Sequence, residues 1–177
     1  MLIDYGQKVE VKMPIKETDL TDVIVQWGNE LIAISAIYEE KGIEQATIMA
    51  SEMLDRLYGF EFGPVLFKPT LSGGEQTFRT TKQGALSYFV GHDPHYPADT
   101  GFGIKFWREV KSETSAIMIE DNVAMWMGWV MFTDRNGDMV KVDKSFGFRK
   151  SQSGELKIVL HHSSCLLYTS PSPRDCQ

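Results

Sequence analysis

Hydrophobic residues in the first half of the chain recur at three- and four-residue steps, which is typical of amphipathic helices. The first such stretch runs from about Thr18 to a stop near Gly42. Its apolar positions are Leu20, Val23, Ile24, Trp27, Leu31, Ile34, Ile37 and Tyr38. A second helix is predicted from Ile43 to Tyr58, where Gly59 ends it. A third, shorter helix is predicted over residues 81–90, with Thr80 as its N-terminal cap.

From Ile104 onward the pattern changes to the alternation that half-buried strands show. Strands are predicted at residues 117–119, 123–132, 140–148 and 156–160, and a short strand or extended pass is predicted at 65–67. Asp134 to Gly137 contains an Asn-Gly pair, which favours a tight two-residue hairpin turn. Residues 151–154 supply another turn.

Three helices followed by a four-stranded antiparallel meander predict an α+β fold. In this fold a cone-like curved sheet wraps over the three N-terminal helices, and we expect a cavity between its concave face and the helices. Residues 1–17 read as a loosely ordered lead-in, because an alternating segment is followed by Pro14.

The predicted strand over residues 123–132 is apolar on both faces. Methionines at 125, 127 and 131 and Trp129 share one face, while Trp126, Val130 and Phe132 share the other. A strand that is buried on both sides needs a second covering layer. The pattern therefore predicts a homodimer.

The size and charge of the chain narrow the class of protein. Its 177 residues, 42% of them hydrophobic, favour one globular domain with a substantial core. No apolar run approaches the ~20 residues that a membrane span needs, so no membrane partner is expected. The formal net charge of -6, with no concentrated basic stripe, argues against a nucleic-acid partner.

The two ends of the chain differ in character from its body. The segment that begins at Met1 lacks the features of a secretion signal, so a cytoplasmic location is expected. The two cysteines, Cys165 and Cys176, both lie in the last stretch, which leaves the body without thiol chemistry. Residues 165–175 resemble the translation of a transposase-type sequencing adapter. We therefore expect the native domain to occupy residues 1–164 and residues 165–177 to be adapter read-through.

Residues 155–164 place two imidazoles and two hydroxyls at the end of an alternating strand. Regular alternation would put Leu156, Ile158, Leu160 and His162 on one face, and Lys157, Val159, His161 and Ser163 on the other. His161 and His162 then point apart and cannot chelate one metal ion. His92, Asp93 and His95 share a loop without the i, i+4 geometry of a persuasive metal site.

A covalent nucleophile is also disfavoured at this strand. Ser163 and Ser164 stand beside histidines only in sequence, and neither lies in a strand-turn-helix elbow. A purely structural role remains open, in which His161 and Ser163 make hydrogen bonds inside the cavity.

Several motifs, in matching order over residues 15–164, resemble the iota class of carbonic anhydrases. They are Leu-Phe-Lys-Pro-Thr at 66–70, Gly-Ala-Leu-Ser-Tyr-Phe-Val-Gly at 84–91, Gly-Phe-Gly-Ile-Lys at 101–105, Phe-Thr-Asp at 132–134, Phe-Gly-Phe at 146–148 and Leu-His-His-Ser-Ser at 160–164. The element order also resembles the SnoaL-like and nuclear-transport-factor-like fold, on which the calcium/calmodulin-dependent protein kinase II association domain is built.

The resemblance implies a dimeric enzyme that interconverts carbon dioxide and bicarbonate without a metal or other cofactor. It further implies that Thr70, Tyr88 and Ser163 line the substrate pocket. His161 would share a strand face with Ser163, either as a proton relay or as an orienting group. Apolar walls from Phe67, Phe89 or tryptophans could hold carbon dioxide. No base that activates water is evident from the sequence, and Tyr88 could help only if nearby donors or positive charge favoured its phenolate.

Two other classes of function remain open, because this fold hosts many activities. One is a non-catalytic oligomerisation or small-ligand-binding module of the kinase association-domain type. The other is a small-ligand isomerase or cyclase of the SnoaL type, whose cavity Asp or His base is not obvious in this chain.

Overall fold

The computed structural model describes residues 14–165. The expectations for the lead-in up to residue 13 and for the tail from residue 166 onward lie outside this part of the chain. The helices are α1 (Glu17–Lys41), α2 (Ile43–Leu57) and α3 (Lys82–Val90). The strands are β1 (Leu66–Lys68), β2 (Trp107–Glu120), β3 (Val123–Asp134), β4 (Met139–Lys150) and β5 (Leu156–Ser164). Three short 3-10 turns lie at Phe60–Phe62, Gly74–Gln76 and Phe102–Ile104.

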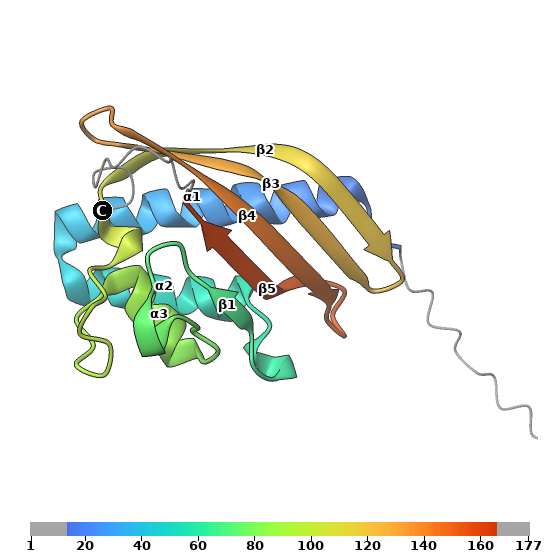
Figure 1. The fold of residues 1–177 in the computed structure, drawn as a ribbon, viewed down its shortest axis with the longest axis horizontal. Coiled ribbons are helices and arrows are strands. Elements are labelled where there is room, and N and C mark those ends of the chain that lie inside the picture. Colours follow the sequence, from blue (N-terminus) through green and yellow to red (C-terminus); the bar gives the residue numbers. More distant parts are fainter. Residues whose placement is uncertain (1–13, 166–177) are drawn as a thin grey trace, which may run out of the picture.

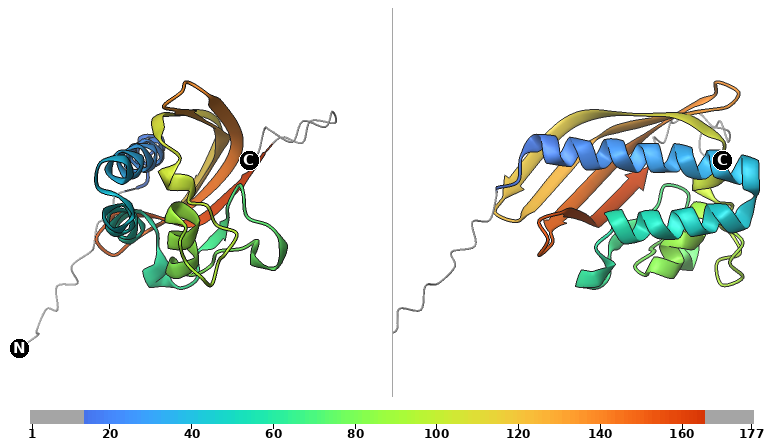
Figure 2. Two further views of the ribbon diagram at one scale, coloured as in Figure 1. Left: turned by 90° about the vertical axis from the view of Figure 1, so that its left-hand side faces the viewer. Right: turned by 180° about the vertical axis from the view of Figure 1, so that it is seen from behind.

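The strands form one curved sheet with the order β1-β5-β4-β3-β2, and the helices lie on its concave side (Figures 1 and 2). The predicted antiparallel meander is confirmed for β2 to β5. β1 adds a fifth strand, which pairs parallel with β5. Helix α1 packs on β2 and on α2, and α2 also contacts α3. None of the helices within residues 14–165 has the length and hydrophobicity required to span a bilayer.

Trp27 of α1 ties the helix to the sheet. Its buried indole contacts Phe132 of β3 at a ring-centroid distance of 6.1 Å, Phe146 of β4 at 5.6 Å and His161 of β5 at 5.4 Å. The helical stripe predicted from the sequence therefore faces the concave side of the sheet, and the core lies between these two layers.

β3 alternates as its sequence predicts, but the described residues cover only one of its two apolar faces. Trp126, Val130 and Phe132 are almost fully buried, whereas Met125 and Met127 are 46% and 56% exposed. The convex side of the sheet thus presents large apolar side chains to the outside.

The prediction that side chains alternate regularly between the two faces along the whole of β5 is wrong, because a β-bulge interrupts the strand at Val159. Gly147 pairs with Leu160 and Phe148 pairs with Ile158, so Val159 is an extra residue without a partner in β4. Because one extra residue reverses the faces of all that follow, Ile158 and His161 both point into the core. Both residues are 1% exposed, and His162 is exposed instead.

Several boundaries also differ from the expectations. The loop after β3 spans residues 135–138, with Gly137 at φ 87°, and is therefore not a two-residue turn. The tight turn lies instead between β2 and β3, where Asp121 adopts φ 50°. β2 is far longer than the predicted 117–119. Most of its residues are exposed and many are polar, as an edge strand allows, so its sequence lacks the apolar alternation on which the prediction relied. The cap of α3 is Thr81 and not Thr80, since the Thr81 hydroxyl accepts a hydrogen bond from the Gly84 amide at 3.1 Å.

Candidate active site

The parallel pairing of β1 with β5 brings Thr70 next to Ser163. Lys68, the last residue of β1, lies opposite His162, so the chain leaves β1 beside the end of β5. The Thr70 hydroxyl donates to Ser163 Oγ at 2.6 Å, and Ser163 Oγ donates to the carbonyl of Asp143 at 3.0 Å. Ser163 is fully buried, while Thr70 is partly buried. Because Thr70 donates to Ser163 and Ser163 donates onward to Asp143, the Thr70 oxygen keeps lone pairs that can accept a further hydrogen bond.

Tyr88 projects from α3 and is only 5% exposed. Its ring stacks on Phe102 at 5.5 Å and meets Phe67 edge-on at 5.6 Å. Its hydroxyl has no hydrogen-bond partner among the described residues. Burial raises the pKa of the Tyr88 phenol, and the Thr70 side chain and the backbone of Leu71 and Thr70, which lie near its oxygen, only partly oppose this effect. Tyr88 is therefore a neutral hydrogen-bond donor with a free proton, and the phenolate is disfavoured.

His161 is fixed between aromatic rings. It stacks on Phe67 and lies against Phe146, each at a centroid distance of 4.5 Å. Its Nδ1 lies 2.9 Å from the Tyr58 hydroxyl and its Nε2 lies 3.0 Å from Lys144 Nζ. Burial, with a contribution from Lys144, holds the pKa of His161 well below its usual range. The ring is neutral, and it has no free nitrogen to offer to Ser163.

A buried ion pair supports the helix that carries Tyr88. Arg79 donates to Asp99 Oδ1 at 2.8 Å, and Ser87 of α3 donates to Asp99 Oδ2 at 2.7 Å. The side chains of Arg79 and Asp99 are 2% and 5% exposed. The Asp99 carboxylate also adds to the rise in the pKa of Tyr88. The pair therefore anchors α3 and helps to keep the phenol protonated.

Comparison with known proteins assigns this chain to a protein family. The family model described as metal-independent carbonic anhydrase matches residues 18–165. The chain belongs to the family of metal-independent carbonic anhydrases. A metal-independent carbonic anhydrase from Nostoc sp. (strain PCC 7120 / SAG 25.82 / UTEX 2576) is 44% identical over 170 residues, which cover 91% of this chain and 83% of the relative.

Solved structures agree with this family. The crystal structure of a cyanobacterial iota-carbonic anhydrase complexed with bicarbonate has a TM-score of 0.89 and 43% identity, and the match covers 92% of this chain and 99% of that one. A calcium/calmodulin-dependent protein kinase II association domain from Xanthomonas campestris has a TM-score of 0.54 at 17% identity, with 93% of this chain and 98% of that one covered. This second likeness shows the fold alone.

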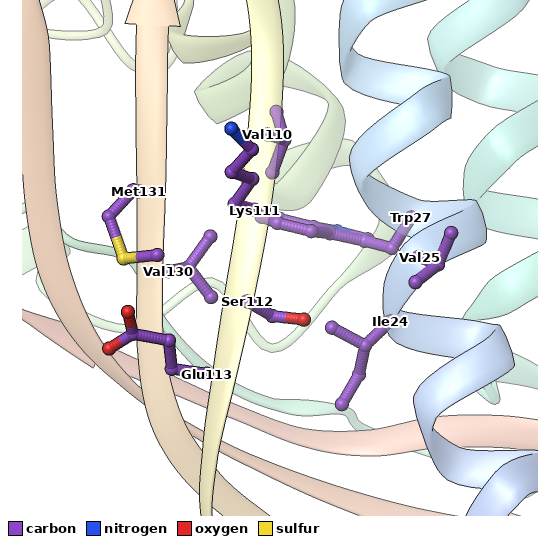
Figure 3. A pocket seen from close by; sticks show the side chains of 9 residues that line it. All are labelled: Ile24, Val25, Trp27, Val110, Lys111, Ser112, Glu113, Val130 and Met131. Atoms are coloured by element: carbon purple, nitrogen blue, oxygen red, sulfur yellow. The ribbon is translucent and has the colours of Figure 1, made fainter.

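A pocket of about 330 Å³ opens between α1 and the strands β2 and β3 (Figure 3). It is lined by Ile24, Val25, Trp27, Val110, Lys111, Ser112, Glu113, Val130 and Met131. None of the four site residues that the family resemblance implies is among these. Trp27 borders this pocket and also contacts His161 at 5.4 Å. The pocket is therefore not where the polar groups converge, and we place the candidate site at the hydroxyl cluster.

The loop that contains His92, Asp93 and His95, which was weighed as a metal site, has a hydrogen-bonded histidine–aspartate pair at the surface. His95 Nδ1 lies 2.9 Å from Asp93 Oδ1, and the histidine side chain is 76% exposed. Within residues 14–165, no group of three or more His, Cys, Asp or Glu side chains is arranged to hold a metal ion.

Sequence reasoning missed Tyr58 and Lys144, which both contact His161. Lys144 carried a readable signal, because it stands between Val142 and Phe146 in the inward alternation of β4, and all three are at most 3% exposed. A lysine in such a pattern is unusual, since an unpaired charge is costly to bury. Tyr58 follows the end of α2 and carried no comparable signal.

Proposed function

We propose that this protein catalyses the reversible hydration of carbon dioxide to bicarbonate, without a metal, in a pocket formed by Thr70, Tyr88 and Ser163. Family membership supports this reaction class. The observation that carries the placement of the site is the buried Tyr88 hydroxyl, which has no hydrogen-bond partner within residues 14–165 and lies near the hydrogen-bonded Thr70 and Ser163 hydroxyls. A buried donor without a partner costs free energy, and a bound ligand oxygen would satisfy it.

The free groups of this cluster match bicarbonate. Bicarbonate can accept the Tyr88 proton at one oxygen and donate its own O–H to the Thr70 oxygen, whose lone pairs are available. Ser163 holds Thr70 in place through their 2.6 Å hydrogen bond. Phe67 and Phe102 flank the Tyr88 ring and offer apolar surface to the uncharged carbon dioxide. In this proposal His161 acts behind the site and does not contact the substrate.

The test is stopped-flow measurement of carbon dioxide hydration with metal content assayed on the same sample. Tyr88→Phe and Ser163→Ala should each reduce kcat/KM by about 100-fold, the loss expected when a positioned polar group is removed from a reacting centre. Tyr38→Phe and Ser164→Ala are matched controls, since Tyr38 packs on Phe106 and Ser164 bonds the Asp143 carboxylate. Full activity in Tyr88→Phe, or no activity in the wild-type protein at any metal content, would reject the proposal.

We also propose that residues 1–164 are a single catalytic domain that acts as a homodimer in the cytoplasm. The convex face of the sheet supports the dimer, because Met118, Met125 and Met127 are between 46% and 56% exposed there. Met127→Asp should convert the dimer to a monomer in light scattering coupled to gel filtration. A wild-type protein that is monomeric at micromolar concentration would contradict the assignment.

A non-catalytic assembly module of the kinase association-domain type is the second candidate, and the shared fold favours it. The same experiments separate the two classes. An assembly module would keep its oligomeric state in every variant that leaves the convex face intact, and it would not hydrate carbon dioxide.

A further inference from the structure

Lys144 is a buried lysine on the concave face, directly across the sheet from Ser163. The two residues are Cα partners in the register of β4 and β5, and they are 3% and 0% exposed. Side chains of directly opposed residues on one face start about 5 Å apart. The Lys144 amine therefore belongs to the same interior as the hydroxyl cluster, although it points toward His161.

The hydrogen bonds around His161 have a direction. Trp27 Nε1 can only donate, and it donates to the Tyr58 oxygen at 3.0 Å. The Tyr58 hydroxyl can then donate its own proton to His161 Nδ1, 2.9 Å away. With Nδ1 accepting, a neutral imidazole carries its proton on Nε2 and donates it to Lys144 Nζ at 3.0 Å. Only an uncharged amine has the lone pair to accept this bond, so Lys144 is neutral in this arrangement.

The surroundings of Lys144 favour the same state. Burial lowers the pKa of Lys144 to about 7, and Lys68 contributes in the same direction, while Asp143 and Cys165 oppose it. His162 lies near enough to His161 to lower the pKa of that ring further. When the amine does take up a proton, the rings of Trp27 and Phe132 lie 4.9 and 5.8 Å from Nζ and can stabilise the cation.

The other end of this chain of hydrogen bonds, at Tyr58, lies in the same aromatic cluster as Tyr88. Tyr58 and Tyr88 both contact the rings of Phe67 and Phe89, at centroid distances between 5.5 and 6.3 Å. Burial raises the pKa of the Tyr58 phenol, and the nearby Tyr88 adds to that rise, while the hydrogen bond from Trp27 opposes it. Neither tyrosine is therefore a base in its own right.

We propose that Tyr58, His161 and Lys144 form a proton wire that carries the proton released during carbon dioxide hydration from the pocket to the Lys144 amine. The inference rests on the proposed function. As a water oxygen bonds to the carbon of carbon dioxide, its O–H bond breaks and that proton passes to the Tyr58 oxygen. The original Tyr58 proton moves to His161 Nδ1, and the Nε2 proton moves to Lys144 Nζ. The products are bicarbonate and a lysine ammonium, and the reverse sequence is the dehydration of bicarbonate. After hydration, the resting state returns when the ammonium gives its proton to a buffer base in the solvent.

This arrangement explains how an uncharged site can make an anion. The positive charge on Lys144 forms as the negative charge forms on bicarbonate, so the interior stays neutral overall. It also supplies the proton acceptor that Tyr88, as a protonated phenol, does not provide. A base that titrates near the working pH is the most effective choice for such a transfer.

Lys144→Met and Tyr58→Phe test the wire. Each should lower kcat by about 100-fold with KM for carbon dioxide unchanged, because proton transfer and not substrate binding is removed. The double variant should be no slower than either single variant, since all three groups act as one unit. Lys144→Arg, which cannot accept a proton, should be as slow as Lys144→Met. Lys157→Met and Tyr38→Phe are the matched controls, because Lys157 is 8% exposed but bonds the Arg56 carbonyl away from the site.

A second measurement does not depend on activity. In protein carrying ¹³C-labelled lysine, the Cε resonance that is lost in Lys144→Met should titrate near neutral pH in the wild type. Wild-type activity in Lys144→Met, or titration of this resonance in the ordinary lysine range, would overturn the wire while leaving the proposed reaction intact. Absence of hydration activity in the wild type would instead refute the proposed function.

Discussion

Replacing Lys144 by Met should change the stability of the protein in a pH-dependent way. The pKa of this lysine falls from 10.5 to about 7 on folding, chiefly through burial. At about 1.4 kcal/mol for each pH unit, this difference corresponds to about 5 kcal/mol. Below pH 7 the buried amine is protonated in both states, and the folded protein carries the full penalty. As the pH rises from 7 to 10.5 the folded amine is neutral, and the penalty disappears.

Methionine has a similar length and no charge, so the variant is free of this penalty at every pH. Its cost is the loss of the acceptor for His161 Nε2, which is about 1–3 kcal/mol for a buried donor left unpaired. We therefore expect the variant to be about 2–4 kcal/mol more stable than the wild type at pH 6. Near pH 10.5 it should be about 1–3 kcal/mol less stable.

Urea unfolding followed by circular dichroism at several pH values from 6 to 10.5 measures this difference, provided that the transition is two-state. Subtracting the two proteins at each pH removes the contribution of the other titrating groups. Lys157→Met serves as the control, because Lys157 is also largely buried but donates to the Arg56 carbonyl at 2.6 Å, away from His161. A stability difference between Lys144→Met and the wild type that stays constant across this range would refute the reasoning, because the lysine would then titrate alike in both states.

Three further predictions concern stability. Tyr58→Phe removes the hydroxyl that faces His161 Nδ1 and should destabilise the fold by about 2–4 kcal/mol, measured by urea unfolding at pH 8. Thr81→Ala should cost about 1 kcal/mol through loss of the α3 cap, whereas Thr81→Ser should be nearly neutral in the same assay. Gly128→Ala should lower the melting temperature by several degrees, because its Cβ would lie 2.1 Å from the Glu113 carbonyl oxygen and β2 would have to shift. An unchanged melting temperature would show that this edge of the sheet yields easily.

The periodicity of hydrophobic residues was sufficient to predict the helices and strands that bury one continuous row of apolar side chains. Leu20, Ile24, Trp27, Leu31 and Ile34 recur at helical steps, and all are at most 3% exposed in α1. The alternation of β3 likewise predicted which of its side chains share a face, but not which face the helices would cover. These features follow from local spacing, because the helical and strand repeats alone decide which side chains share a face.

The geometry of the candidate site could not be predicted from local residue spacing alone. The motifs of the family pointed to Thr70, Tyr88 and Ser163, and the structure brings Thr70 and Ser163 into contact with Tyr88 nearby. Regular alternation would have put Ile158 and His161 on opposite faces of β5. The unpaired Val159 reverses this assignment, and the bulge depends on the pairing with β4 and not on β5 alone.

The sequence by itself determined the helices, the meander and, through its motifs, the family. Only the tertiary structure decided that Tyr58 from the end of α2, Lys144 from β4 and His161 from β5 would share one line of hydrogen bonds. The reason is physical. A side chain's face depends on its immediate neighbours in sequence, whereas its hydrogen-bond partner and its pKa depend on which distant segments exclude water around it.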